Sequence, residues 1–124
     1  MTIEKHEIKV STTGSAGSAS GSAVLTLPLS ESVAVHVNFH SSAPSTSDTT
    51  FTASGNPLAV TLLTLTDDNT DKWLYPKTQD HDNTGSAITG SYSSPVIHGG
   101  SLTITLAQYD ALTDAVVVTI YVRV

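Results

Sequence analysis

Apolar and polar residues alternate along several stretches of the chain with the two-residue period of a β-strand. The clearest stretch runs from Ser32 to His40. We predict that one face of this strand holds its apolar residues, Val33, Val35, Val37 and Phe39. Residues Ser101 to Ala107 alternate in the same way. In the run from Ala115 to Val124 even the second face carries Val and Tyr, so we expect both faces to be at least half covered.

Weaker alternation predicts six further strands. They are Ile3 to Val10, Ala23 to Leu29, Thr49 to Ala53, Leu58 to Leu65, Trp73 to Lys77 and Pro95 to His98. No window of about a dozen residues shows a sustained helical period. Short strands at intervals of about 8–12 residues, separated by turn-forming residues, predict an all-β fold. We expect an antiparallel β-sandwich or barrel of jelly-roll or Greek-key type.

The segment from Ser11 to Ser22 (STTGSAGSASGS) has the composition of a flexible linker. We therefore divide the chain into residues 1–22, a strand with a flexible segment, and residues 23–124, the sandwich domain. One hypothesis is that the first strand is an arm that pairs with a neighbouring subunit. Its apolar candidate contact residues are Ile3, Ile8 and Val10. The alternative is a long mobile loop within one subunit.

Charge and composition exclude several kinds of partner. The chain of 124 residues fits one domain, and its formal net charge is −6. Its five Lys and Arg residues are too few to neutralise several phosphates, so we expect no nucleic-acid partner. Cysteine is absent, which rules out disulfides and thiolate metal ligands. No apolar run suits a membrane span or a signal peptide, so we expect no membrane partner.

Catalytic motifs are absent, and we predict a non-enzymatic protein without a cofactor. His36 and His40 would share a strand face but lie about 13 Å apart, too far to chelate one ion. Two acidic segments, Asp67 to Asp71 and Asp80 to Gly85, resemble part of a calcium loop but lack its bidentate Glu. We interpret both as solvated turns and predict no functional metal.

Trp73 and Tyr75 are separated by one residue, so they would share one face of a strand. An exposed aromatic pair would stack against a sugar or anchor a protein partner. Because the chain has one Trp and two Phe, the simpler interpretation is that Trp73 fills the core.

Two stretches in the second half carry a family resemblance. One holds the motif Asn-Thr-Asp-x-Trp-x-Tyr-Pro at residues 69–76, and the other runs from Ser94 to Gln108. The second combines Pro-Val-x-x-Gly with an alternating strand. Over roughly residues 58–124 the chain resembles small β-rich virion proteins of tailed bacteriophages, of the kind encoded near the major capsid protein. The resemblance implies a head decoration (cement) protein and carries over no catalytic residue.

That role implies a place in the virion, on the outside of the capsid, with the major capsid protein and further copies of the chain as partners. We expect a trimer, because three-fold lattice points favour a matching symmetry. Trp73, Tyr75 and Lys77 are the candidate contact residues near the motif. Lys77 stands where the resembling proteins have Arg, so it offers a point charge in place of a guanidinium fork. The alternatives are a phage tail, fibre or adhesin-like domain, or a carbohydrate-binding module that uses Trp73 and Tyr75.

Overall fold

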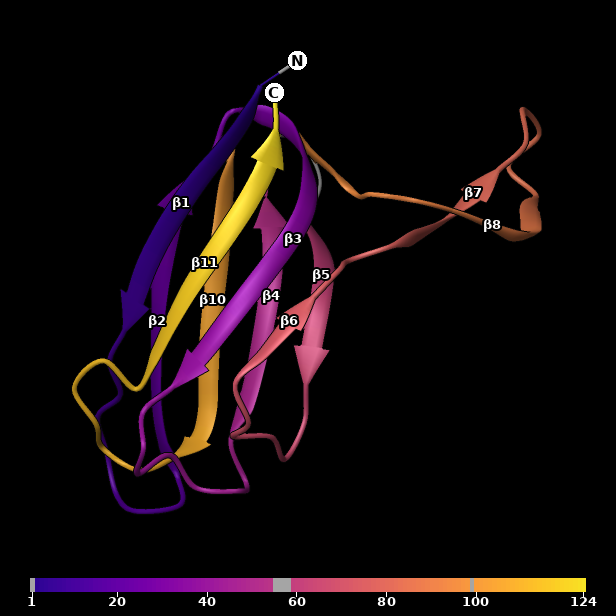
Figure 1. The fold of residues 1–124 in the computed structure, drawn as a ribbon. Coiled ribbons are helices and arrows are strands. Elements are labelled where there is room, and N and C mark those ends of the chain that lie inside the picture. Colours follow the sequence, from indigo (N-terminus) through magenta and orange to yellow (C-terminus); the bar gives the residue numbers. More distant parts are fainter. Residues whose placement is uncertain (1, 55–58, 99) are drawn as a thin grey trace.

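Two antiparallel β-sheets lie face to face and enclose the alternating apolar residues (Figure 1). The computed structural model describes residues 2–54, 59–98 and 100–124. The first sheet has the strand order β1-β11-β3-β6, and β9 also pairs with β3. Its strands are β1 (Ile3–Val10), β3 (Leu29–Phe39), β6 (Lys72–Leu74), β9 (Val96–His98) and β11 (Val116–Arg123).

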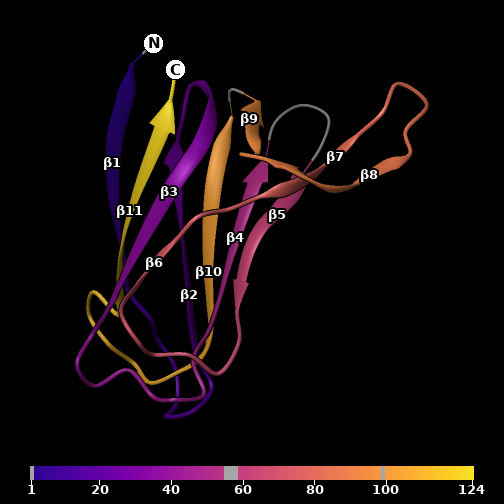
Figure 2. The ribbon, with the colours of Figure 1, turned by 45° about the vertical axis from the view of Figure 1, so that its right-hand side comes forward.

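The second sheet has the order β2-β10-β4-β5, and β7 pairs with β8 in a separate hairpin. Figure 2 shows β1, β11 and β3 in one layer and β10, β4 and β5 in the other. The strands are β2 (Ala19–Thr26), β4 (Asp48–Ser54), β5 (Ala59–Leu65), β7 (Thr78–His81), β8 (Ala87–Ser93) and β10 (Ser101–Tyr109). The predicted all-β antiparallel sandwich is confirmed, while its jelly-roll or Greek-key type stays a prediction.

Most predicted strands agree with the structure, with three differences. The strand predicted from Ala23 to Leu29 is β2, which runs from Ala19 to Thr26, and Leu29 is instead the first residue of β3. Sequence patterns missed β7 and β8, which are largely polar and carry no apolar alternation. The strand predicted from Trp73 to Lys77 is β6, which starts one residue earlier, at Lys72, and ends at Leu74. It ends before Pro76, which cannot donate a hydrogen bond within a ladder. Leu58, the predicted start of β5, lies outside the described residues.

The core comes mainly from the inner faces of β10 and β11. Every second residue of these strands has no exposed surface: Leu102, Ile104, Leu106, Val116, Val118, Ile120 and Val122. Fully burying one such side chain contributes about 1.5–3 kcal/mol. Strict alternation fixes the register, since a shift by one residue would turn the whole apolar set toward solvent.

A bulge in β3 changes the predicted face of Val33. Tyr121 pairs with Ala34, whereas the next residue of β11, Val122, pairs with Ser32, so β3 holds one extra residue. The extra residue is Val33, which is half-buried, while Ser32 is fully buried on the inner side. The prediction that Val33 shares the face of Val35 is therefore wrong, because a bulge reverses the alternation.

The N-terminal strand lies in the sheet of its own chain, which corrects the arm hypothesis. Over its whole length β1 pairs with β11, from Ile3 opposite Arg123 to Val10 opposite Val116. Val10 is buried in the core, and Ile8 packs against it. Of the three apolar candidates in this strand, only Ile3 is exposed. Apolar burial at Val10 and a complete backbone ladder explain why this strand joins the sandwich.

The Ser/Gly/Ala-rich segment is a tightly paired crossing between the sheets, which corrects the prediction of a flexible linker. Thr13 and Ser20 exchange two backbone hydrogen bonds, and Ala19 is fully buried. The Thr12 hydroxyl donates to the carbonyl of Asp110 at 2.6 Å. Gly21 passes so close to Ser11 that a Cβ on Gly21 would lie 2.0 Å from the Ser11 carbonyl oxygen. Small residues therefore serve close backbone approach here.

This close approach makes Gly21→Ala a test of the segment. The added methyl group cannot fit beside the Ser11 carbonyl, so we expect a loss of at least about 1–3 kcal/mol in the free energy of unfolding. Ser22→Ala, at the exposed neighbouring position, should change it by less than about 0.5 kcal/mol. Urea denaturation of both variants measures the difference, and equal stability would mean that the segment is not closely packed.

Tyr109 closes the end of the core at the last residue of β10. Its side chain is fully buried, and its hydroxyl lies 2.7 Å from the Thr49 hydroxyl, which is also buried. Burial raises the pKa of the Tyr109 phenol above its ordinary value, because ionisation would place a charge away from water. The folded state thus holds this proton more tightly than the unfolded chain does.

We therefore expect the stability of the protein to fall at alkaline pH. The contribution of Tyr109 is complete below about pH 10, the pKa of an unfolded tyrosine, and is lost as the pH rises toward the higher folded pKa. Tyr109→Phe should cost about 1–2 kcal/mol at neutral pH, since it leaves the Thr49 hydroxyl without its partner. The variant should then lose less stability than the parent between about pH 9 and pH 11. Tyr75→Phe, at an exposed position, is the control and should change neither quantity.

Candidate interaction surface

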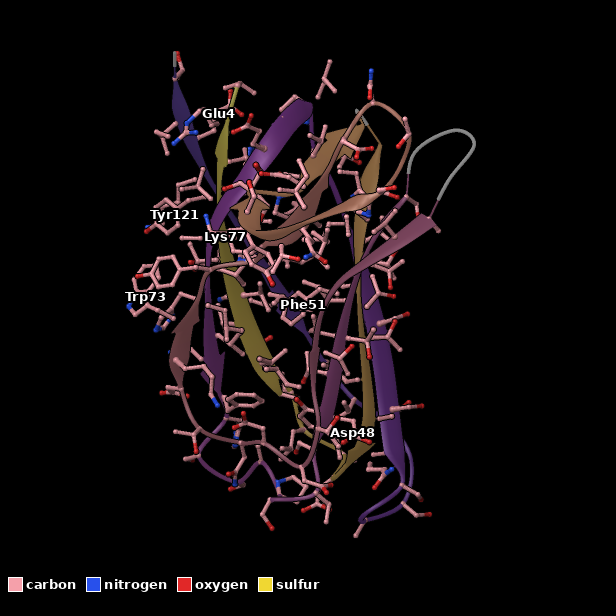
Figure 3. The ribbon with its side chains drawn as sticks, turned by 90° about the vertical axis from the view of Figure 1, so that its right-hand side faces the viewer. Glu4, Asp48, Phe51, Trp73, Lys77 and Tyr121 are labelled. Carbon is pink, nitrogen blue, oxygen red and sulfur yellow. The ribbon has the colours of Figure 1, made fainter. Side chains whose placement is uncertain are left out.

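Three aromatic rings gather on the outer face of the first sheet. Trp73 of β6 pairs with His36 of β3, and their ring centroids lie 4.7 Å apart. Tyr121 belongs to β11, the strand that pairs with the opposite edge of β3 from β6. Its ring centroid lies 5.7 Å from that of Trp73. Figure 3 shows Trp73 and Tyr121 at the same side of the molecule, pointing away from the sandwich. We call these three rings, together with the exposed Tyr75 that follows β6, the aromatic surface.

Trp73 is half exposed, at 50%, so the prediction that it fills the core is wrong. The pairing of β6 with β3 explains this placement. Leu74, opposite Val35, packs against the core, and alternation then turns Trp73 outward. Tyr75 follows with 64% exposure, and Lys77 is also exposed. The predicted residues near the motif therefore lie on one accessible stretch, in contrast to Ile8 and Val10.

Charged side chains from β1 border the aromatic surface. Lys5 pairs with Tyr121, and the exposed Glu7 and Lys9 continue the same face along β1. At one end Arg123 donates a hydrogen bond to Glu31 at 3.1 Å. An aromatic centre with a polar rim is the usual arrangement of a protein-binding site.

Sequence reasoning did not include His36 or Tyr121 in this surface. Both were expected on the less apolar face of their strands, but alternation within a strand does not show which strands become neighbours. Trp73 meets them because β6 pairs with β3 and β3 with β11. His40 lies at the far end of β3, where its Nδ1 accepts a hydrogen bond from the Ser42 amide at 3.0 Å.

The acidic segment at residues 67–71 is tied to the end of β3 and to the loop that follows it. The Asp71 carboxylate accepts a hydrogen bond from the Phe39 amide at 2.7 Å, and the Asn69 side chain donates to the Ala43 carbonyl at 2.8 Å. Lys72 forms an ion pair with Asp68. The hydrogen bond from Lys72 within this ion pair, together with one from the Thr70 amide, lowers the pKa of the Asp68 carboxyl. The polar groups of this segment thus have partners at the end of β3, in the loop that follows β3, and at Thr70 and Lys72.

The acidic residues of the β7–β8 hairpin hold the hairpin itself together. The Asp82 carboxylate accepts hydrogen bonds from the Thr84 hydroxyl at 2.7 Å and from the Thr84 and Ser86 amides. Asp80 accepts from Ser91 and Ser93, both at 2.6 Å. These hydrogen bonds lower the pKa of both carboxyl groups. Within residues 2–54, 59–98 and 100–124, no three His, Asp or Glu side chains form a cluster that could hold a metal ion.

The outer face of the second sheet differs from the aromatic surface. Its outward positions are mainly Ser and Thr, such as Thr103 of β10 and Thr52 of β4, which pair with each other. Val24 of β2 is an exposed apolar residue on this face. The two sides of the sandwich therefore offer different chemistry, one aromatic and charged and the other hydroxyl-rich.

No protein family, curated protein or solved structure matches this chain. In the described part of the chain, no helix is long and apolar enough to cross a membrane.

We predict that calcium leaves the protein unchanged, since carboxylates of both acidic segments, such as those of Asp71 and Asp82, already accept hydrogen bonds from other groups of the chain. Thermal melts with millimolar calcium and with a chelator should give the same melting temperature, and elemental analysis should find no stoichiometric metal. A calcium-dependent rise of several degrees would contradict this prediction. Asp82→Asn tests the source of such a rise, because it removes one carboxylate charge and keeps a side-chain acceptor for the turn.

Proposed function

We propose that this chain is a non-catalytic structural protein of a tailed-phage virion, a decoration (cement) protein that binds the outside of the capsid. The exposed aromatic surface carries the proposal. Its Trp and Tyr side chains are of the types that dominate protein–protein binding energy. The resemblance of residues 58–124 to small virion proteins indicates the kind of partner, the major capsid protein.

Other features of the chain are compatible with this role. A rigid sandwich presents the aromatic surface on strands, which hold side chains more firmly than loops do. A negatively charged chain with few basic residues needs no affinity for the DNA inside the shell. Repetition of one modest contact over a symmetric lattice raises avidity without a strong single site. We propose a trimer as the unit bound to the shell.

A carbohydrate-binding module is the second candidate, favoured by the exposure of Trp73 and Tyr75. Exposed aromatic rings also stack against sugars, so the same side chains would serve a different ligand. A phage tail, fibre or adhesin-like domain would use such a site at the cell surface.

Co-sedimentation with empty capsid shells of the phage that encodes the chain tests the proposal. Trp73→Ala should weaken shell binding by about thirtyfold, the equivalent of the roughly 2 kcal/mol lost at a binding hot spot. Val24→Ala, an exposed apolar residue on the opposite sheet, is the matched control and should bind like the parent. Both variants should keep their melting temperatures within a few degrees of the parent, because both side chains are at least half exposed and neither belongs to the buried core. Binding to polysaccharide or cells, without binding to shells, would support the second candidate.

A further inference from the structure

The basic side chains of this acidic chain gather on the outer face of the first sheet. Lys5 stands opposite Tyr121, whose ring is part of the aromatic surface, and directly opposite residues of an antiparallel pair share a face. Lys9 and Arg123 lie on this face too, because they follow Lys5 and Tyr121 by four and two residues. Lys77 is exposed just beyond the end of β6. Four of the five basic residues therefore lie on or beside the aromatic surface.

Most acidic side chains lie elsewhere. Among the residues that the structure describes, the strand register places only Glu7 and Glu31 of the eleven acidic residues on this face. Glu31 forms an ion pair with Arg123. Asp71, two residues before Trp73, uses its carboxylate to accept a hydrogen bond from the backbone at the end of β3. The other acidic residues lie mainly in loops and in the β7–β8 hairpin. Because the net charge is −6, this face is a basic region on an otherwise acidic molecule.

The charges on this face alternate and do not form a continuous basic track. Lys5 and Lys9 are about 13 Å apart along β1, and Glu7 stands between them. Glu7 would oppose the dense row of phosphates of a nucleic acid. Exposed aromatic rings with a rim of mixed charges are instead typical of a contact with another protein. Lys5 and Lys9 form no ion pair with the described residues, so carboxylates of a partner can face them.

We propose that the aromatic surface docks on an acidic surface of a partner protein, with partner carboxylates against Lys5 and Lys9. The rings of Trp73 and Tyr121 would form the centre of the contact, and the two lysines would belong to its polar rim. This inference rests on the proposed function, which makes the major capsid protein the partner. An acidic shell would repel the acidic loops and hairpin and attract only this face. Charge would therefore set the orientation in which the chain attaches.

Trp73 gives a direct test, because it is the one tryptophan of the chain and its fluorescence reports on the aromatic surface. Poly-L-glutamate titrated at about 0.01 M salt should change this emission, and about 1 M salt should abolish the change by screening. Poly-L-lysine is attracted by the net negative charge but should bind elsewhere and leave the emission unchanged. The proposal is overturned if poly-L-glutamate has no effect, or if poly-L-lysine alone changes the emission.

Two double variants with the same net charge separate a local effect from a global one. Lys5→Gln with Lys9→Gln removes the two lysines, and Ser22→Glu with Thr26→Glu adds two carboxylates at exposed positions of β2, in the other sheet. The lysine variant should bind poly-L-glutamate about three- to tenfold more weakly than the parent, as expected for two exposed charge pairs. At about 0.1 M salt, where charges more than about 10 Å apart are largely screened, the β2 variant should bind within about twofold of the parent. An equal loss in both variants would show that net charge alone decides binding and would overturn the proposal.

Co-sedimentation with capsid shells separates this proposal from the decoration role. The lysine variant should bind shells more weakly than the parent, and the β2 variant should bind like the parent. Equal shell binding by the parent and the lysine variant would overturn the acidic partner and leave the decoration role in place. Binding to poly-L-glutamate without binding to shells would overturn the decoration role and leave an acidic protein partner. Tighter binding to duplex DNA or to polygalacturonate than to poly-L-glutamate would overturn the protein partner in favour of a nucleic acid or an acidic polysaccharide.

Discussion

The register between β3 and β11 is the constraint on which the rest of this structure depends. Inner residues of the two strands, such as Val35 opposite Ile120, are buried between the sheets, and this burial holds the pairing in place. Once they face inward, His36 and Tyr121 must face outward. The aromatic surface is therefore a direct consequence of the core, and the bulge at Val33 lets Ser32 replace Val33 at the inner position.

The Ser/Gly/Ala-rich segment shows why composition can mislead. Residues 11–22 have few apolar side chains, which suggested that burial could not offset the conformational entropy lost when these residues become ordered. In the fold these residues are ordered through backbone pairing and through hydrogen bonds to the loop that follows β10, including that from Thr12 to Asp110. Gly21 is required there because its backbone touches Ser11. A run of small residues indicates either a flexible backbone or close contact between two backbones. Which of the two occurs depends on whether another segment of the chain packs beside it.

The residues that stabilise the fold and the residues that are accessible to a partner lie in different parts of this molecule. The sandwich buries its apolar residues and uses its polar turns to close loops, as Asp71 does at the end of β3. The aromatic surface and the β7–β8 hairpin lie outside this core, so their side chains can change with little effect on folding. Such a division is compatible with the proposed role in attachment, because rigid strands would present contact residues in a fixed geometry.

The sequence by itself determined the all-β class and most strand positions. These features are local, since alternation and turn residues act over a few neighbours in the chain. Tertiary structure decided that Val10 belongs to the core, that Trp73 is exposed and that Tyr121 lies beside it. Each of these depends on which strands become neighbours, a long-range pairing set by burial between the sheets. The two-residue alternation of a strand shows which side chains share a face. It does not show which other strand or sheet will cover that face.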